Sequence, residues 1–488
     1  MKFDVETLSR IQFALTIMFH YLFPPLSIGL GALMVIMEGT YLRTGNKEYE
    51  TMARFWTRIF AVNFAMGVAT GIVMEFQFGT NWASYSRFVG DVFGSALAAE
   101  GIFAFFLESG FLSILVFGWD RVSKRMHFFS TCMVCLGAIF SSVWIIIANS
   151  WQQTPAGSHV ETVLVNGLQF KRAVIDDFWA MVFNPSSMAR LAHTVVAAFV
   201  LGAFVVLSIS AFYILKNRFV ELAKKMFRIA LIFGGGCTVL VGALGHHQAK
   251  VVAETQPAKL AAFEGYFHAE PDGAPLLLMG YPDEESETVV HGVFLPGGLS
   301  FLVHNDFHTP VAAMDSIPKE DRPHVMIPFL AFHVMIGVGS GLIGLAVLAL
   351  FFLWRGTLFE KRWLLWIFVF ASVGPYIANQ AGWVAAEAGR QPWVVYGQLR
   401  TSEAYTKSLT SGQVMASIVM FGIIYALLFA VWVYVLNDKI QHGPVAADLS
   451  EKDNPIPGPG ITNLEQVLAK DPKRMTMIMR KGDSGKGN

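Results

Sequence analysis

The feature that most constrains the fold is the recurrence of long apolar runs along the chain. Each run has the roughly 20 residues that an α-helix needs to cross the hydrocarbon core of a bilayer. Only 15% of the 488 residues are charged, against roughly 25% in soluble domains. The sequence therefore predicts an all-α, polytopic membrane helical bundle of about nine transmembrane helices, near residues 10–37, 53–78, 93–118, 127–150, 187–215, 226–246, 325–354, 362–385 and 412–436.

Lys and Arg gather in alternate short loops, and this sets the predicted orientation. The loops after the first, third, fifth and seventh runs are basic, and the loops between them are poorer in basic residues. Short basic loops stay in the cytoplasm, so we expect the amino terminus outside and the carboxyl terminus in the cytoplasm. No cleavable signal peptide is expected, because the first run is too long for an h-region. The formal net charge is zero, which leaves no basic footprint for nucleic acid.

One long loop and the carboxyl-terminal tail divide the chain into four predicted parts. Residues 1–246 hold the first six helices, and residues 325–440 hold the last three. Residues 247–324 form an outer loop rich in Pro, Gly, His and acidic residues, and loops of this length are commonly functional. Residues 441–488 are rich in charge, Pro and Gly and are predicted to be a disordered cytoplasmic tail. No internal repeat is visible, which argues against a repeat-built transporter.

A carboxylate lies inside an apolar helix in the segment Asn379–Trp393, which ends in Gly-Arg-Gln-Pro-Trp. The carboxylate is Glu387, and Trp383 lies four residues before it on the same helical face. A charged group at membrane depth is costly and marks a functional site by default. An aromatic plane beside a lone carboxylate suits a flat, metal-bearing cofactor.

Histidines in the apolar runs are candidate ligands for such a cofactor. His20 and His193 each carry an imidazole of the kind that ligates haem iron, although a membrane histidine more commonly bonds a neighbouring helix. His333 and Met335 are two residues apart. They point about 200° apart on a helix, so both cannot face one cofactor. Periodicity does not choose between them, and methionine is also a common core filler.

Two carboxylates lie in the third apolar run. Glu100 and Glu108 are eight residues apart, which on one helix is about 80° in rotation and about 12 Å along the axis. This spacing suits successive stations on a proton path. Mutual pairing within the protein is the alternative, but two unpaired acids in an apolar helix are costly.

Two short motifs are expected to be structural. Gly67-Val-Ala-Thr-Gly71 is a small-xxx-small pattern typical of helix packing. Cys132 and Cys135 form a CxxC pair inside an apolar run. Since no second CxxC or His pair completes a metal site, we interpret them as small apolar residues.

Several motifs occur together in the order of one known family. They are Leu8–Leu15 followed by His20, Gly67–Gly71, Met74–Trp82, Glu100 with Phe105–Glu108, Ala192–Val195 and Gly389–Trp393. With these motifs the chain resembles subunit I of the cytochrome bd-type quinol oxidases over about residues 5–440. The outer loop lacks an insertion present in some members, so the resemblance is to the short-loop branch, which includes the cyanide-insensitive oxidases.

The resemblance implies three haems in this subunit. His193 and Met335 would hold a low-spin haem b near the outer face. His20 and Glu387 would ligate two adjacent high-spin haems, one haem b and the other haem d or a third haem b. His333 stands where many relatives have Arg, so it remains a rival ligand or an altered charge near the first haem.

The resemblance also implies roles for residues around the haems. Glu100 would serve as a second ligand or proton donor, and Glu108 would lie further along the proton route. Trp383 would stand between haems, and Arg390 would meet a propionate. Two residues at the end of the fourth helix match family positions near the haems, namely Asn149 and Trp151.

The outer loop corresponds to the quinol-binding loop of the family, with Lys259–Glu264 as its quinol-interacting segment. Lys259 would bond a quinone oxygen, and Glu264 would accept the quinol proton. Without the family, both residues are expected to form a solvated surface pair.

The implied function is that of a haem-containing subunit of a quinol:dioxygen oxidoreductase in the bacterial cytoplasmic (inner) membrane. Ubiquinol or menaquinol would be oxidised at the outer face, and O2 would be reduced to water with cytoplasmic protons, generating a proton motive force without pumping. The implied partners are subunit II of the oxidase and, as a further candidate, a small single-helix subunit. The alternatives are a di-haem quinone oxidoreductase with a non-oxygen acceptor and a haem-free proton-coupled transporter.

Overall fold

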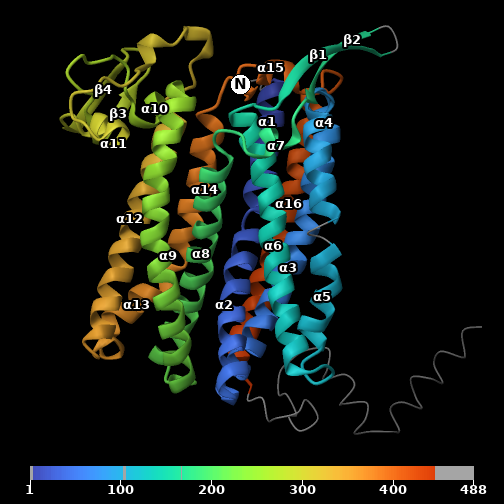
Figure 1. Ribbon diagram of the computed structural model, residues 1–488, viewed down its shortest axis with the longest axis vertical. Helices are drawn as coiled ribbons and strands as arrows, with labels where there is room; N and C mark the ends of the chain where they lie inside the picture. Colours follow the sequence, from blue (N-terminus) through green and yellow to red (C-terminus); the bar gives the residue numbers. More distant parts are fainter. Residues whose placement is uncertain (1–3, 103–105, 166–167, 446–488) are drawn as a thin grey trace, which may run out of the picture. The chain divides into compact units, whose positions relative to one another are not determined.

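The computed structural model describes residues 4–102, 106–165 and 168–445 (Figure 1). The predicted disordered tail therefore lies outside the described residues from residue 446 onward. Within the described part, eight helical stretches are long and apolar enough to cross a membrane: Val5–Thr44, Lys47–Thr80, Lys124–Gln153, Ser187–Leu215, Val220–Thr255, Met326–Trp354, Arg362–Ala388 and Ser411–His442. They match eight of the nine predicted runs and confirm the polytopic helical bundle, while the orientation in the membrane stays a prediction.

Seven helices form single long rods in this bundle. In chain order they are α2 (Pro24–Thr44), α3 (Lys47–Thr80), α6 (Lys124–Gln153), α8 (Ser187–Leu215), α9 (Val220–Thr255), α12 (Met326–Trp354) and α16 (Ser411–His442). Their long axes run roughly side by side in Figure 1. The shorter helices in the bundle are α1 (Val5–His20), α4 (Ala83–Glu100), α5 (Phe106–Phe117), α13 (Arg362–Ala371) and α14 (Val373–Ala388).

One predicted run is interrupted within the described residues. It is divided between α1 and α2, because Pro24 and Pro25 lack the amide protons that a continuing helix needs and instead begin α2. His20 is consequently the last residue of α1. The third predicted run contains α4, which ends at Glu100, and α5, which carries Glu108. Residues 103–105 between them lie outside the described residues, so the geometry predicted for the two acids on one helix stays a prediction.

The break between α1 and α2 is held from a neighbouring helix. Asn63 on α3 is fully buried, and its side-chain amide donates to the Phe23 carbonyl at 2.8 Å and to Ser27 Oγ at 2.9 Å. These bonds occupy polar groups that the break releases and that no water could reach in the membrane. The position of His20 is therefore fixed by α3 as well as by its own helix.

The outer loop is folded and is not an open loop. α9 runs to Thr255, nine residues beyond the predicted end of its run, and α10 (Pro257–Glu264) follows directly. A hairpin then pairs β3 (Leu276–Asp283) with β4 (Thr288–Leu295) in antiparallel register, and α11 (Gly298–His304) comes after it. Buried apolar side chains of α10 and the hairpin pack against α12, so the loop is anchored on the bundle.

The remaining elements are small and connect the helices. β1 (Ser158–Val165) and β2 (Leu168–Ile175) form a hairpin after α6, followed by α7 (Phe178–Val182). After α14, β5 (Trp393–Val395) pairs with β6 (Leu399–Arg400), and α15 (Thr401–Ala404) leads to α16. The membrane part is all-α as predicted, and these short hairpins are additions that the sequence prediction did not contain.

Close packing of α2 on α8 depends on two facing glycines. A Cβ on Gly202 would lie 2.5 Å from Gly29 Cα, and a Cβ on Gly29 would lie 2.4 Å from the Ala198 carbonyl oxygen. We expect Gly202→Ala to force the two backbones apart and to destabilise the protein by about 1–3 kcal/mol. Thermal unfolding of the detergent-solubilised protein measures this effect. The control is Gly344→Ala on α12, where a Cβ meets nothing within 4 Å, and equal melting temperatures for both variants would contradict the prediction.

Candidate functional site

Glu387 lies at the end of α14 among side chains from other helices. Asn149 Nδ2 and Gln153 Nε2, both on α6, each donate to Glu387 Oε1 at 3.1 Å. Arg390, just beyond α14, pairs with the other carboxylate oxygen. The Glu387 side chain nevertheless keeps 34% of its surface accessible, whereas that of Arg390 keeps 7%. The carboxylate is thus oriented by three partners and still presents a free surface.

Two further cations surround the same carboxylate. Arg190 Nη2, from α8, donates to Asn149 Oδ1 at 2.5 Å. Lys259, from α10, donates to Gln153 and to Gln256 Oε1, the latter at 2.5 Å. One amide side chain therefore connects each of them to Glu387. Asn149 connects Arg190, and Gln153 connects Lys259.

The cluster carries more positive than negative charge. Two buried guanidinium groups, those of Arg190 and Arg390, stand against the one carboxylate of Glu387, and the buried amine of Lys259 lies beside them. Arg190 Nε and Arg390 Nε have no hydrogen-bond partner although both are buried. Uncompensated buried cations are costly, and guanidinium groups bind carboxylates through paired donors. The cluster therefore fits an anionic ligand such as the propionates of haem.

His193 lies three residues after Arg190 on α8. Its Nδ1 is buried without a hydrogen-bond partner, and its ring faces Gly245 of α9, where a Cβ would lie 3.3 Å from Cε1. A buried unpartnered imidazole nitrogen costs free energy unless a ligand or metal takes it up. The donor type and the bare glycine beside it fit an axial haem ligand.

Met335 and His333 point to different parts of the molecule. A Cβ on Gly382 of α14 would lie 2.8 Å from Met335 Sδ, so the thioether reaches the helix that carries Trp383. His333 Nδ1 lies 3.0 Å from the Phe329 carbonyl oxygen, and its Nε2 lies 3.1 Å from the Leu277 carbonyl oxygen of β3. Both ring nitrogens of His333 are therefore occupied by main chain, which favours Met335 as the ligand of the pair.

His20 faces the small-residue motif of α3. Its Nδ1 bonds Thr70 Oγ1 at 2.9 Å, and a Cβ on Gly71 would lie 3.2 Å from its Cε1. A Cβ on Gly67 would lie 3.3 Å from Phe23 Cβ, so the Gly67–Gly71 motif is a packing contact, as predicted. The bond to Thr70 orients the ring in the way that second-shell partners orient metal-binding histidines.

Trp383 contacts the surroundings of both histidines. Its ring packs edge-on against Tyr21, the neighbour of His20, with centroids 5.6 Å apart. The Arg190 guanidinium lies 5.7 Å above the same ring. Trp383 therefore stands between the end of α1 and the start of α8. Trp151 is placed differently, because its Nε1 donates to Ser158 Oγ at 3.1 Å and its fully buried ring packs in a separate cluster with Trp82.

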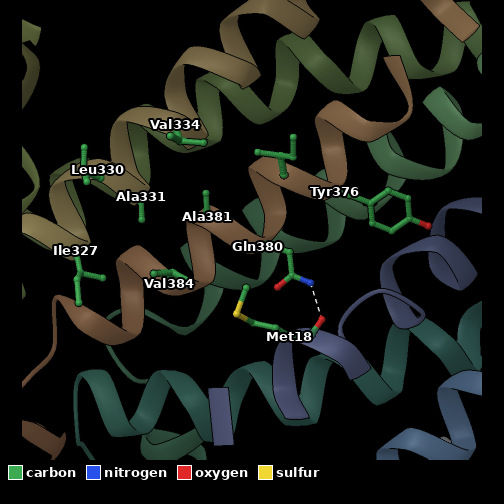
Figure 2. A pocket seen from close by; sticks show the side chains of 10 residues that line it. Met18, Ile327, Leu330, Ala331, Val334, Tyr376, Gln380, Ala381 and Val384 are labelled. Carbon is green, nitrogen blue, oxygen red and sulfur yellow. Dashed lines mark hydrogen bonds between the residues drawn. The ribbon is translucent and has the colours of Figure 1, made fainter. Parts of the chain in front are cut away.

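An apolar groove of about 560 Å³ lies beside these ligand-bearing helices. Figure 2 shows side chains of α1, α12 and α14 around it, with Gln380 Nε2 donating to the Met18 carbonyl at 2.7 Å. Ile327, Leu330 and Val334 line it and are each more than 40% exposed. The groove is therefore reachable from the lipid and suits apolar solutes.

The two predicted proton-path acids both lie against α6. Ser141 Oγ donates to Glu100 Oε1 at 2.9 Å, and Gly137 accommodates Glu108, whose Cγ would lie 2.4 Å from a Cβ at that position. Their contact residues are four apart, which is about 6 Å along α6. Glu100 and Glu108 thus both contact α6. Further along, the same helix carries Asn149, which bonds Glu387.

Lys259 and Glu264 are buried, with 2% and 5% exposure, so the solvated surface pair expected without the family is wrong. Burial lowers the pKa of the Lys259 amine well below its usual range, and nearby Arg190 lowers it further. Burial raises the pKa of the Glu264 carboxyl to about 8, and its Oε2 has no hydrogen-bond partner. The Glu264 carboxyl can therefore take up and release a proton near neutral pH. The Phe263 ring between them stacks on Phe332 of α12 at 4.5 Å.

Two site residues were not identified from the sequence, namely Arg190 and Gln153. Arg190 is a lone cation three residues before His193 at the start of an apolar run, and a charge in that position is a functional signal. Gln153 follows Asn149 by four residues and so shares its helical face. The free thiols of Cys132 and Cys135 are apart from this cluster. In the described part of the chain, no group of three His, Cys, Asp or Glu residues could hold a bare metal ion.

Known proteins resemble this chain along most of its length. Cytochrome bd ubiquinol oxidase subunit 1 of Bacillus subtilis (strain 168) is 39% identical over 445 residues, which cover 89% of this chain and 93% of that protein. Cytochrome bd-II ubiquinol oxidase subunit 1 of Escherichia coli (strain K12) is 35% identical over 508 residues, which cover 91% and 98%. A chain in the structure of bd oxidase from Geobacillus thermodenitrificans has a TM-score of 0.82 at 30% identity, covering 91% of this chain and 100% of that chain.

The apolar helices and these relatives make the protein a multi-pass protein of the bacterial inner membrane. The family model described as cytochrome bd terminal oxidase subunit I matches residues 8–444. The chain therefore belongs to the cytochrome bd terminal oxidase subunit I family.

Proposed function

We propose that this chain is the haem-bearing subunit of a terminal quinol oxidase, oxidising quinol at the outer face and reducing O2 to water with cytoplasmic protons. Its family and relatives support the oxidase activity. The observation that carries the finer assignment is the cluster around Glu387, where buried cations exceed carboxylates and guanidinium nitrogens lack partners. When bound, haem would supply the iron that accepts electrons and binds O2.

The ligand assignment follows the side chains that meet glycines on neighbouring helices. His193 and Met335 would hold a low-spin haem b, and both side chains are positioned by direct contact with a glycine of a neighbouring helix, Gly245 and Gly382. His20 beside Gly71 would serve one of two high-spin haems, and Glu387 the other. The second high-spin haem is haem d or a further haem b.

The cations would bind the propionates. Arg390 was expected in this role from the family, and the structure adds Arg190 and its free Nε as a second candidate. Trp383 would lie between haems. Its ring contacts Tyr21, the neighbour of His20, and Arg190, which precedes His193 by three residues on α8. An aromatic ring in that place would exclude water and hold the two regions at a fixed separation.

Quinol oxidation would take place at α10. Lys259 would donate a hydrogen bond to a quinone oxygen, and Glu264 would accept a quinol proton and release it outside. The carboxylate form of Glu264 is the acceptor, so its pKa of about 8 makes its ionisation sensitive to pH near neutrality. Protons for water formation would come from the cytoplasm along α6 through Glu108 and Glu100. Charge separation would then arise from two half-reactions on opposite sides of the membrane, without pumping.

A partner follows from the same assignment. The relatives are subunit 1 of their oxidases, which implies a second subunit for this chain. We therefore expect the activity to belong to a hetero-oligomer with subunit II.

An absorption spectrum tests the proposed function directly. Membranes containing this chain and its partner subunit should show, after dithionite reduction, low-spin haem b together with a haem band that carbon monoxide shifts. A far-red band would add haem d, and its absence would indicate an oxidase with haem b alone. Low-spin haem without a carbon monoxide response would overturn the proposal in favour of a non-oxygen reductase. A spectrum without haem would favour the transporter.

The ligand pair on α12 is tested by two matched substitutions. We expect Met335→Leu to remove the low-spin haem b signal or to lower its midpoint potential, because the thioether that reaches α14 is lost. His333→Leu should retain that signal, since its ring bonds only main-chain carbonyls. Redox titration of the reduced band measures both. The opposite pattern, in which only His333→Leu loses the haem, would show that the assignment is wrong.

The pH dependence of quinol oxidation tests Glu264. Its pKa of about 8 lies above the ordinary value, so the accepting carboxylate is scarce at low pH and grows as pH rises towards 8. We expect kcat/KM for quinol to rise with pH over this range in the wild type. Glu264→Gln should lower kcat/KM by about 10²–10⁴-fold and abolish its rise with pH. If kcat/KM of Glu264→Gln still rises with pH over this range, the titrating group is a different one.

A further inference from the structure

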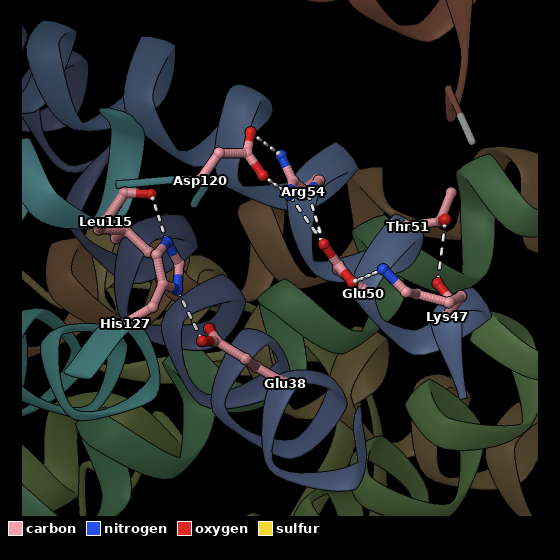
Figure 3. A network of polar contacts seen from close by, with 8 residues as sticks. All are labelled: Glu38, Lys47, Glu50, Thr51, Arg54, Leu115, Asp120 and His127. Carbon is pink, nitrogen blue, oxygen red and sulfur yellow. Dashed lines mark hydrogen bonds and ion pairs between the residues drawn. The ribbon is translucent and has the colours of Figure 1, made fainter. Parts of the chain in front are cut away.

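A buried acid–imidazole pair lies far from the ligand cluster. Glu38 on α2 and His127 on α6 are 3% and 1% exposed, and His127 Nδ1 lies 2.6 Å from Glu38 Oε1. Thr131 Oγ1 donates to the other carboxylate oxygen at 2.5 Å. The pair lies at the end of the bundle that carries the basic loops after α2 and α5, which is the predicted cytoplasmic end. Figure 3 shows Glu38 and His127 facing each other.

The imidazole joins the carboxylate to a different helix. His127 Nε2 lies 3.1 Å from the Leu115 carbonyl of α5, so one ring nitrogen faces Glu38 and the other faces α5. A histidine can take up a proton on one nitrogen and release it from the other. The ring is therefore placed to carry a proton from the α2 side to the seam between α5 and α6.

The same seam leads to Glu108. Leu115 and Glu108 are seven residues apart on α5, which puts them on one face about 10 Å apart along the axis. Glu108 then lies against Gly137 of α6, and Glu100 bonds Ser141 one turn further on. The acids and the imidazole thus follow one helix–helix seam.

An aromatic ring and charged groups cover the Glu38–His127 pair. The Trp119 ring covers His127 with centroids 3.7 Å apart, and the Arg54 guanidinium lies 4.7 Å above the Trp119 ring. Arg54 bonds Asp120 Oδ1 at 2.7 Å, and the Asp120 side chain is 82% exposed. The Cys132 thiol lies within electrostatic reach of Glu38. A solvent-exposed carboxylate therefore lies one residue from the aromatic cover of the pair.

Glu50, a second buried acid nearby, forms ion pairs with Arg54 and Lys47 and serves as a comparison for Glu38. Glu50 on α3 is 4% exposed and bonds Arg54 at 2.8 Å, with Lys47 at 3.2 Å from its other oxygen. Its partners keep their protons at physiological pH. The partner of Glu38 is instead the His127 imidazole, which has two ring nitrogens that can each carry a proton. Of the two acids, Glu38 is the one equipped to exchange a proton.

We propose that the Glu38–His127 pair is a proton-relay station that takes up protons from the cytoplasmic side and delivers them through the α5–α6 seam to Glu108. For each electron that reaches O2, one proton leaves the His127 ring towards Glu108 through bridging water. One proton from the cytoplasm replaces it, so the pair returns to its starting state. The relay rests on the proposed function and adds an entry point to it. Glu38 and His127 act through Glu108 and are positioning residues.

The test uses the assembled oxidase with Glu38→Gln, which keeps the shape of the side chain and removes its charge. The reduced spectrum and the carbon monoxide response should match the wild type, because the haem region is distant. Proton uptake during reoxidation by O2, followed with a pH-indicator dye, should slow at least about tenfold, and the pH profile of turnover should change. Glu38→Asp should restore part of the rate.

The matched control is Glu50→Gln, which removes a buried carboxylate that does not face the seam. It should keep wild-type proton uptake. His127→Gln provides the second variant and should slow uptake as Glu38→Gln does. Wild-type uptake and pH profile in Glu38→Gln would overturn the relay. Loss of haem or assembly in both Glu38→Gln and His127→Gln would show a structural clamp and would also overturn it. A wild-type complex without carbon monoxide-sensitive haem would instead be a failure of the proposed function.

Discussion

The organisation of this protein depends on one electrostatic constraint, the placement of ionisable side chains in a low-dielectric membrane interior. An isolated carboxylate there costs several kcal/mol, so Glu387 is held by Asn149, Gln153 and Arg390 from two sides. The same constraint acts on the cations. Arg190 and Lys259 are connected to the carboxylate through amide side chains, which orient them. The two guanidinium groups exceed the one carboxylate in charge, and this excess would favour an anionic ligand.

Glycines provide the complementary steric condition. Three of the four proposed ligands face a glycine on a neighbouring helix, where a Cβ would lie within 3.3 Å of the ligand side chain. A larger residue there would push the donor atom aside, so helix packing and ligand position are set by the same residues. The break before Pro24 acts in the same way, since it ends α1 at His20 and leaves its polar groups to Asn63. Local backbone geometry thus decides where the donors stand.

The sequence predicted what local periodicity controls and missed what depends on long-range packing. The apolar runs predicted eight of the observed helical stretches, and Trp383 and Glu387 lie four residues apart on one helix, α14. Burial of Lys259 and Glu264 was not predictable from their polar, Pro-containing surroundings, because it results from α10 folding back onto α6 and α12. The sequence prediction of one continuous run over residues 10–37 missed the division between α1 and α2, although Pro24 and Pro25 are a local signal for it. The convergence of Arg190 on Asn149 has no local signature beyond a charge at the start of an apolar run.

α6 connects the two chemical regions. At one end it carries His127 and Thr131, then the contact residues of Glu108 and Glu100, and at the other end Asn149 and Gln153, which bond Glu387. Electron transfer through Trp383 would instead cross between α1, α8 and α14. Protons and electrons would therefore reach the same carboxylate region from different sides of the bundle. Such a separation lets a proton be supplied from one side of the membrane while quinol is oxidised at the other, and this geometry is what a charge-separating oxidase without a pump requires.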